Sequence, residues 1–150
     1  MRPEVDRGSP HYPAGVATAQ PASDELPPTR FANFALGLDA AFCNIVGLVF
    51  TLTGAFMADW LGIPGWAATL FGVLVLMWSF VVTLFANRRV SRRREVNVTM
   101  WFNVAFVVVA VGVLAIPGSL SSNGKILLAI GTVIVAAFAI AQAFARRDLV

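Results

Sequence analysis

The chain has 150 residues, of which 58% are hydrophobic and 13% charged, and its net charge is +3. Soluble globular domains carry charge on roughly a quarter of their residues, so this composition excludes an ordinary soluble domain. The positive charge gathers in one segment without interleaved aromatic residues, and we therefore expect no nucleic-acid partner. The single cysteine, Cys43, excludes an intramolecular disulfide.

The N-terminal segment, residues 1–30, has little to bury. It contains six prolines and many small residues, and its acidic and basic side chains nearly cancel. Such a composition predicts a disordered tail. His11 lies alone in this tail and is interpreted as a solvated residue.

Four apolar runs follow the tail. Each is long enough to cross the hydrocarbon core of a bilayer, which takes about 20 helical residues. The connecting stretches ADWLGIPGW and PGSLSSNGK contain the glycine and proline typical of turns. The sequence therefore predicts an all-α integral membrane protein, a bundle of four transmembrane helices within residues 31–147. The expected helices cover about 36–58, 66–86, 98–116 and 126–145.

The stretch ANRRVSRRREVN, residues 86–97, joins the second and third helices. It holds the basic residues Arg88, Arg89, Arg92, Arg93 and Arg94. Short basic segments stay on the cytoplasmic side of a membrane, and Arg146 and Arg147 after the fourth helix agree with the same orientation. Both termini are therefore expected in the cytoplasm.

Two further interpretations of this basic segment remain open. Its arginines should attract anionic lipid headgroups, at roughly 1 kcal/mol each near the surface. Ser91 also follows Arg88, Arg89 and Val90, a pattern of the kind that basophilic protein kinases recognise, and a phosphate there would remove much of the local positive charge.

The chain also matches itself when it is shifted by 59 positions. Asn44 then falls on Asn103, Gly72 on Gly131, and Arg88 on Arg147. These identities favour a duplicated helical hairpin. Because both hairpins start on the cytoplasmic side, the repeat is parallel, with a pseudo-two-fold axis along the membrane normal.

Asp39 is the one acidic residue inside the predicted transmembrane runs. Asp59 must lie outside the membrane, and counting about 20 residues back puts the cytoplasmic boundary near Asp39. We expect Asp39 at this boundary, anchored by Arg30 or by the arginines of the basic segment. The alternative is a role in binding a proton or a cation.

Four neutral polar residues are expected deeper than Asp39, in one layer of the bundle: Asn44, Thr83, Asn103 and Gln142. The leading interpretation is hydrogen bonding between helices, worth about 0.6 kcal/mol on average for each pair. The alternative is a polar vestibule, open to the cytosol, that binds a small solute or a lipid headgroup.

Small residues recur at helical spacing along the first helix, which predicts close packing against a neighbouring helix. They are Asn33, Gly37, Ala40, Asn44, Gly47, Thr51 and Gly54.

The sequence favours a protein without enzymatic activity. Nucleophilic catalysis needs a base beside a serine, cysteine or threonine, and the predicted helices contain no histidine, no lysine and, as the only carboxylate, Asp39 at their margin. There is no phosphate-binding glycine loop and no pair of haem-ligating histidines, so no metal and no cofactor is expected.

The chain resembles a family of small uncharacterised four-helix bacterial integral membrane proteins. The resemblance covers about residues 33–147 and rests on LGLDAAFCNIVGLVF, the LGIPG turn, the arginine-rich middle segment, the asparagine of the third helix and QAFARR. It implies the plasma membrane of a bacterium and carries no agreed activity.

These observations favour an accessory or interaction subunit that binds another membrane protein or a second copy of this chain. The alternative is a small-solute transporter or channel.

Overall fold

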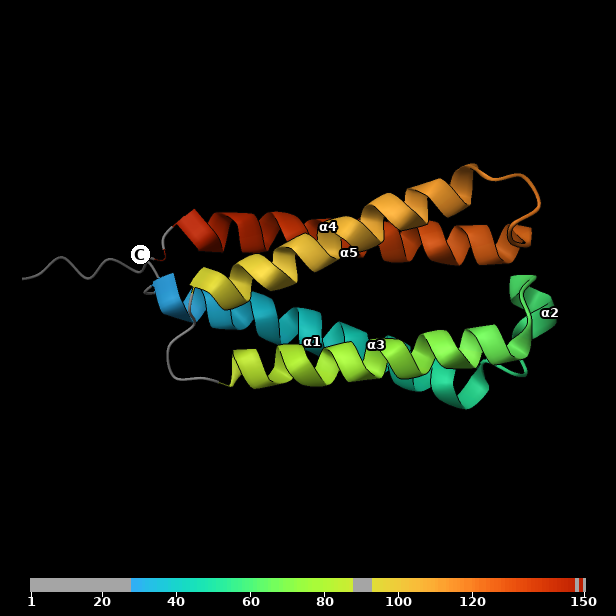
Figure 1. Ribbon diagram of the computed structural model, residues 1–150, viewed down its shortest axis with the longest axis horizontal. Helices are drawn as coiled ribbons and strands as arrows, with labels where there is room; N and C mark the ends of the chain where they lie inside the picture. The colour runs from blue at the N-terminus through green and yellow to red at the C-terminus, as the bar shows by residue number, and fades with distance from the viewer. Residues whose placement is uncertain (1–27, 88–92, 148, 150) are drawn as a thin grey trace, which may run out of the picture.

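The computed structural model describes residues 28–87, 93–147 and 149, and all elements in these ranges are helices. They are α1 (Pro28–Thr53), α2 (Ala58–Leu61), α3 (Gly65–Ala86), α4 (Arg93–Ala115) and α5 (Ser122–Arg147). By length and composition, α1, α3, α4 and α5 can each cross a membrane. Consecutive long helices run in opposite directions, and α2 lies at the end opposite the start of α1 (Figure 1). The predicted bundle of four transmembrane helices is confirmed.

The ends of the first helix differ from the prediction. Its expected span was 36–58, whereas α1 covers Pro28–Thr53. Proline fits the first turn of a helix because no partner is needed there for its missing N–H, so the predicted tail boundary at residue 30 is too late. At the other end, the N–H groups of Phe56 and Met57 both donate to the Thr53 carbonyl, at 2.9 and 3.0 Å, and the chain turns. Residues 1–27, most of the predicted disordered tail, lie outside the described residues.

The basic segment is shorter as a loop than expected. α4 begins at Arg93, so Arg93 and Arg94 form its first turn, and both side chains are exposed. Arg88, Arg89, Ser91 and Arg92 lie outside the described residues.

The hairpin of α1 and α3 is held by close backbone contact. A Cβ atom added to Gly47 would lie 2.8 Å from Leu76 Cγ and 2.9 Å from the Leu76 backbone nitrogen. A Cβ on Gly72 would collide with the backbone of Thr51. Small residues permit such close approach. The small-residue packing predicted for the first helix is therefore confirmed at Gly47 but not along the whole stripe, because Gly37 has nothing within 4 Å of an added Cβ and Asn44 is exposed.

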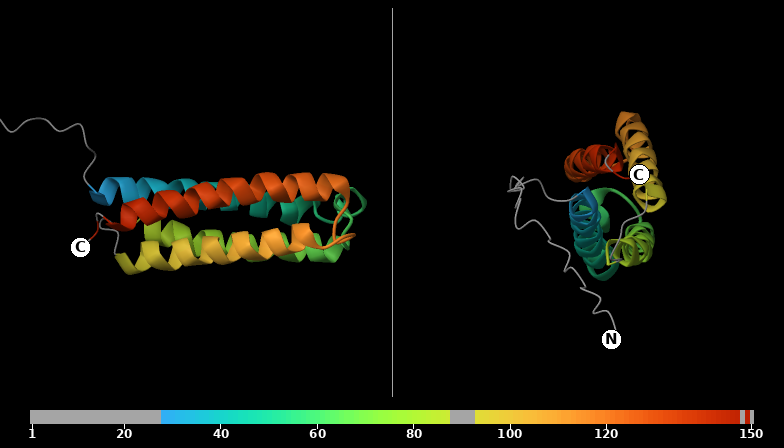
Figure 2. Two further views of the ribbon diagram at one scale, coloured as in Figure 1. Left: turned by 90° about the horizontal axis from the view of Figure 1, so that it is seen from above. Right: turned by 90° about the vertical axis from the view of Figure 1, so that its left-hand side faces the viewer.

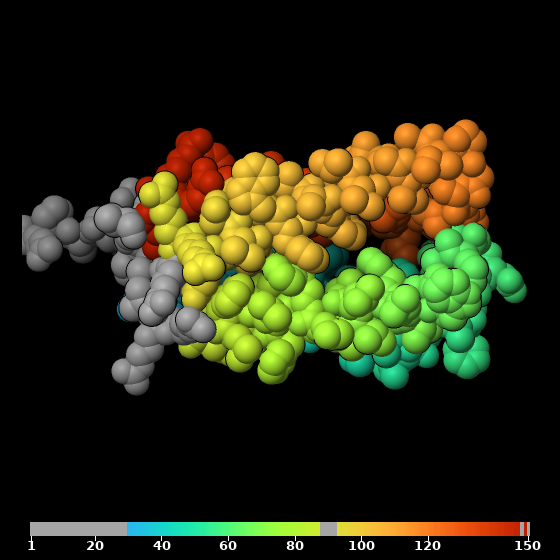
Figure 3. All heavy atoms as spheres, viewed as in Figure 1, coloured from blue at the N-terminus to red at the C-terminus, as the bar shows by residue number. Residues whose placement is uncertain are grey.

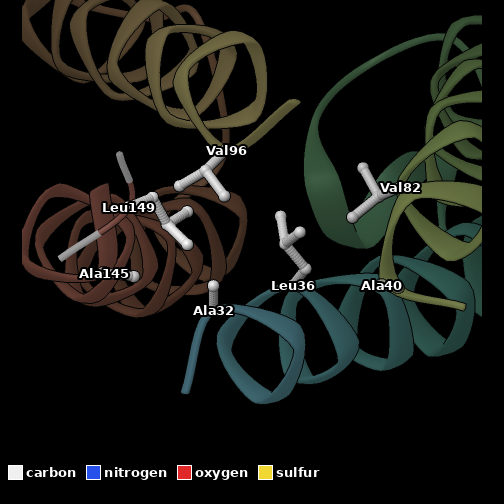
Figure 4. Close-up of a cluster of buried hydrophobic side chains, with 7 residues drawn as sticks. All are labelled: Ala32, Leu36, Ala40, Val82, Val96, Ala145 and Leu149. Carbon is white, nitrogen blue, oxygen red and sulfur yellow. The ribbon is translucent and has the colours of Figure 1, made fainter. Parts of the chain in front are cut away.

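Apolar side chains fill the bundle at the end where α1 and α4 begin. Figure 4 shows this cluster, which draws on all four long helices and on Leu149. Its buried members are Ala32, Leu36, Ala40, Val82, Val96, Ala145 and Leu149.

The two hairpins meet again at the end that carries α2. The Ser121 N–H donates to the Leu61 carbonyl at 3.0 Å, and its hydroxyl donates to the Trp60 carbonyl. Gly62 has φ +74°, a conformation that glycine adopts without strain, and ends α2 beside Ser121.

The hairpins are related by a parallel pseudo-two-fold, with a register of 60 positions rather than the predicted 59. The buried positions Leu36, Asp39, Ala40 and Cys43 of α1 match the buried positions 96, 99, 100 and 103 of α4. In the second helix of each hairpin, the buried positions 72, 79 and 82 match 132, 139 and 142.

Aromatic contacts between the hairpins follow the same register. Phe42 meets Phe138 edge to face, with ring centroids 5.7 Å apart. The equivalent pair, Phe102 and Trp78, lies stacked at 3.8 Å. An axis along the bundle therefore exchanges the two hairpins, although the two aromatic contacts differ in geometry.

The pseudo-symmetry is not exact, because the two hairpins approach each other more closely on one side of the bundle than on the other. Seen from one end, the helices surround the bundle axis in the order α1, α3, α4, α5 (Figure 2). α1 packs directly against α5, whereas α3 and α4 lie farther apart. The space-filling view shows a hollow between α3 and α4 (Figure 3). One side of the bundle is thus closed and the other is open.

Candidate functional site

A buried carboxyl lies at the centre of the bundle. The Asp39 side chain is 0% exposed, and Gln142 from α5 and Asn103 from α4, which surround it, are 0% and 3% exposed. The structure thus brings together three of the polar residues singled out from the sequence, each from a different helix. We call Asp39, Asn103 and Gln142 the polar triad.

The triad is a closed hydrogen-bond network. Asn103 Nδ2 donates to Asp39 Oδ2 at 2.7 Å and to Gln142 Oε1 at 3.2 Å, and Gln142 Nε2 donates to Asp39 Oδ2 at 2.8 Å. The Cys43 thiol, one helical turn after Asp39, lies 3.6 Å from Asp39 Oδ1. Hydrogen bonds to a carboxylate are stronger than those between neutral groups, so the triad ties α1 to both helices of the second hairpin.

Asp39 lies deeper than the sequence analysis placed it. Because α1 ends at Thr53 rather than near residue 58, counting about 20 residues back puts the membrane boundary near residue 33. At 1.5 Å per residue, Asp39 then lies about 9 Å inside. Among the described residues, the partners of Asp39 are two amides and a thiol, all uncharged. Arg30, Arg93 and Arg94 are exposed, so the expected anchoring by Arg30 is wrong, and Arg88, Arg89 and Arg92 lie outside the described residues.

Two of the expected layer residues do not join the triad. Asn44 is exposed on the outer surface of α1. In the register of 60 positions Cys43, not Asn44, is equivalent to Asn103, and one residue along a helix turns the side chain by about 100° away from the bundle axis. In the described part of the chain the Asn44 side chain has no hydrogen-bond partner. The Thr83 hydroxyl donates to the Ser79 carbonyl of its own helix at 2.8 Å, as threonine commonly does in membrane helices.

Sequence reasoning gave no role to Ser79, which links α3 to the first helix. Its hydroxyl is fully buried and donates to the Ala40 carbonyl at 2.9 Å. Ala40 directly follows Asp39, so this bond helps fix the backbone that carries the triad. Sequence identities indicated a shift of 59 positions. A shift of 60 aligns Ser79 with the buried position 139 and would have placed Ser79 on a buried face.

A cavity of about 230 Å³ lies beside the triad. It occupies the open side of the bundle between α3 and α4 (Figure 3). Five aromatic side chains contribute to its lining: Phe42, Phe71, Trp78, Phe102 and Phe106. Cys43 and Asn103 belong both to this lining and to the contacts of Asp39. The carboxyl group is therefore one side chain away from a cavity that opens sideways at membrane depth.

The Trp78 indole nitrogen is buried and has no hydrogen-bond acceptor among the described residues. Because buried indole N–H groups usually find an acceptor, this donor is an exception, and it lies in a cavity wall that is mostly apolar.

The basic residues gather at the end of the bundle where α4 begins and α5 ends. Arg146 Nη1 donates to Asn97 Oδ1 at 2.8 Å and so joins these two helices. Arg93, Arg94 and Arg147 are exposed. No group of three or more histidine, cysteine or acidic residues that could hold a metal ion occurs within the part of the chain that the structure describes.

Fold and site together define a small helical protein with four membrane-spanning helices and a polar triad in its interior. No protein-family model, no curated protein and no solved structure matches the chain. The resemblance to a bacterial family therefore stays a prediction.

Proposed function

We propose that this protein is a non-enzymatic accessory or interaction subunit of a bacterial plasma membrane. In this proposal its basic segments and both of its termini face the cytoplasm. The inner polar residues hold the protomer together, and the outer face of α1 binds a helix of another membrane protein.

The observation that carries the proposal is the exposed amide of Asn44. Within the candidate span Arg30–Thr53, Asn44 lies near the middle and faces outward. An amide exposed to lipid leaves two donors and an acceptor without water or protein partners, which is unfavourable in hydrocarbon. A hydrogen bond from a neighbouring helix would satisfy it.

The residues around Asn44 favour the approach of a second helix. Gly37, Ala41 and Asn44 are spaced by four and three positions, so they share one face of α1. A Cβ atom added to Gly37 would meet nothing within 4 Å, so this glycine is not used inside the protomer. We call these three residues the outer α1 face. Small residues at this spacing let two membrane helices pack closely.

The basic end of the bundle supports a second set of contacts, with anionic lipid headgroups. Arg93 and Arg94 begin α4, Arg147 ends α5, and all three are exposed at the same end. Arginines near a membrane surface attract anionic lipids, so this end would orient and retain the subunit in the cytoplasmic leaflet.

The proposal is tested by capturing the tagged protein from its own membranes in native nanodiscs and identifying what is bound by mass spectrometry. We expect a stoichiometric partner that the wild type retains and Asn44→Leu loses. The matched control is Val108→Leu, an exposed position on α4. A wild type that carries only lipid would contradict the proposal, and a second copy of this chain would identify the partner as itself.

A small-solute transporter is the second candidate, and the cavity beside the triad favours it. A membrane-embedded carboxyl is a common device for coupling solute movement to protons or cations. The triad itself is closed and buried, however, which supports a structural role for Asp39. A transporter would lose flux on Asp39→Asn while keeping its fold, whereas a purely structural Asp39 would give a less stable protomer.

A further inference from the structure

We infer that the cavity between α3 and α4 binds a lipophilic organic monocation, a ligand that carries aromatic or alkyl groups around one positive charge. This inference goes beyond the proposed function and does not depend on it, because a subunit that senses such a ligand and a carrier that moves it would share the same site.

The lining of the cavity selects the apolar part of the ligand. Its aromatic side chains come from three helices, with Phe42 on α1, Trp78 on α3 and Phe106 on α4 among them. At about 230 Å³ the cavity exceeds the roughly 150 Å³ of an engineered apolar cavity that takes up benzene. One aromatic group therefore fits inside, and the sideways opening leaves room for the rest of the ligand to extend toward lipid (Figure 3).

The charge of the ligand follows from Asp39. Within the part of the chain that the structure describes, the contacts of this carboxyl are Asn103, Gln142 and Cys43, and none of them brings a positive charge. A carboxylate inside a membrane is stabilised by a counter-ion, and interactions between charges are strong where the dielectric constant is low. None of the described residues that line the cavity is charged. A cation in the cavity would meet the field of Asp39 across one layer of side chains.

Two residues connect the cavity to the carboxyl group. Asn103 Nδ2 is 2.7 Å from Asp39 Oδ2 and Cys43 Sγ is 3.6 Å from Asp39 Oδ1, and both residues line the cavity. Aromatic rings also attract cations through their faces, so the walls and the buried carboxyl favour the same sign of charge. A neutral lipid chain would use the walls alone and gain nothing from Asp39.

The pseudo-symmetry of the bundle does not by itself produce the open side between α3 and α4. The equivalent side is closed, because α1 packs directly against α5. The stacked pair Trp78 and Phe102 bridges α3 and α4 beside the cavity. A ligand would therefore enter from the bilayer between these two helices.

The test uses tetraphenylphosphonium as the probe and the full-length protein in nanodiscs of phosphatidylcholine. Empty nanodiscs measure partitioning into lipid, and tetraphenylborate serves as a probe of similar size and opposite charge. We expect saturable binding of tetraphenylphosphonium at one site per protomer and no saturable binding of tetraphenylborate. Asp39→Asn should weaken the binding at least tenfold.

A second variant separates the site from the stability of the fold. Val75→Phe adds bulk to the cavity wall and leaves the triad intact, and it should also weaken binding at least tenfold. The matched control Val108→Phe, on the exposed surface of α4, should bind like the wild type. Thermal unfolding of each variant tests whether the protomer remains folded.

Several results would overturn the inference. If the protein binds no more probe than empty nanodiscs, the cavity does not bind a lipophilic cation. If both probes bind equally, or if Asp39→Asn binds as tightly as the wild type while Val75→Phe does not, the cavity does not select for positive charge. If both variants bind like the wild type, the ligand lies elsewhere. Loss of the partner captured through the outer α1 face would leave all of these measurements unaffected.

Discussion

Asn103 and Asn44 are both asparagines near the middle of membrane-spanning helices, yet their surroundings are opposite. Asn103 is 3% exposed and donates hydrogen bonds to Asp39 and Gln142. Asn44 is exposed and has no partner among the described residues. A glycine pair repeats the contrast, since Gly47 touches the backbone of α3 and Gly37 faces open space. Inward residues stabilise the protomer, and equivalent residue types facing outward are available to a partner.

The glycine pair should show the largest difference. Gly47→Leu forces a side chain into the backbone of Leu76, and overpacking of a close contact costs about 3 kcal/mol or more when the backbone cannot move. We expect loss of the folded protomer, measured as loss of cooperative thermal unfolding in mild detergent. Gly37→Leu has free space and should unfold like the wild type. Equal stability of the two variants would contradict the α1–α3 packing.

The asparagine pair should come next. Asn103→Leu removes a donor from the Asp39 carboxylate and leaves the Gln142 oxygen short of a partner. Hydrogen bonds to charged groups are worth about 2 kcal/mol, and we expect a loss of that size in the free energy of unfolding, followed by circular dichroism during titration with sodium dodecyl sulfate. Asn44→Leu should leave the unfolding curve unchanged or shift it slightly toward higher stability. If Asn44→Leu lowered the free energy of unfolding more than Asn103→Leu, the inner and outer faces would be wrongly assigned.

A double-mutant cycle measures the coupling energy between two members of the polar triad. Asp39→Ala, Gln142→Ala and the double variant should give a coupling energy of about 1 kcal/mol, in the range found for hydrogen bonds between membrane helices. The same cycle with Asp39→Ala and Asn44→Ala should give no coupling. Coupling near zero in the first cycle would mean that the triad contributes little to stability.

The hydroxyl pair should show the smallest difference. Ser79→Ala removes a buried bond between two helices, from Ser79 Oγ to the Ala40 carbonyl, and should cost about 1 kcal/mol. Thr83→Ala removes a bond within one helix and should change the unfolding free energy by less than half as much. If Thr83→Ala were the more damaging of the two, Thr83 would have a partner on another helix after all.

The fold was accessible from the sequence because the signals for membrane helices are strong. Four long apolar runs, short turns with glycine and proline, and one basic segment define the number and order of the helices without any tertiary information. The ends of the helices were less accessible. The apolar run of the first helix continues past Thr53, where the chain turns, so hydropathy alone placed this end about five residues too late.

The residues of the polar triad could be predicted from the sequence only in part. Asp39, Asn103 and Gln142 were each recognised as polar residues inside apolar helices. Which polar residues face one another depends on rotation about each helix, and a shift of one residue turns a side chain by about 100°. The identities at a shift of 59 paired Asn44 with Asn103, whereas the buried positions repeat at 60 and pair Cys43 with Asn103. In a chain with so few residue types, identities are a weaker guide to register than burial.

The most direct test of the distinction between the inner and outer faces is photo-crosslinking in native membranes. A photoreactive residue at Ala41, beside Asn44 on the outer α1 face, is compared with the same residue at Val108 on α4. We predict a discrete protein adduct from position 41, its loss when Asn44→Leu is added, and only lipid adducts from position 108. Lipid adducts alone from both positions would contradict the interaction surface on α1, and with it the proposed role of this protein as a subunit.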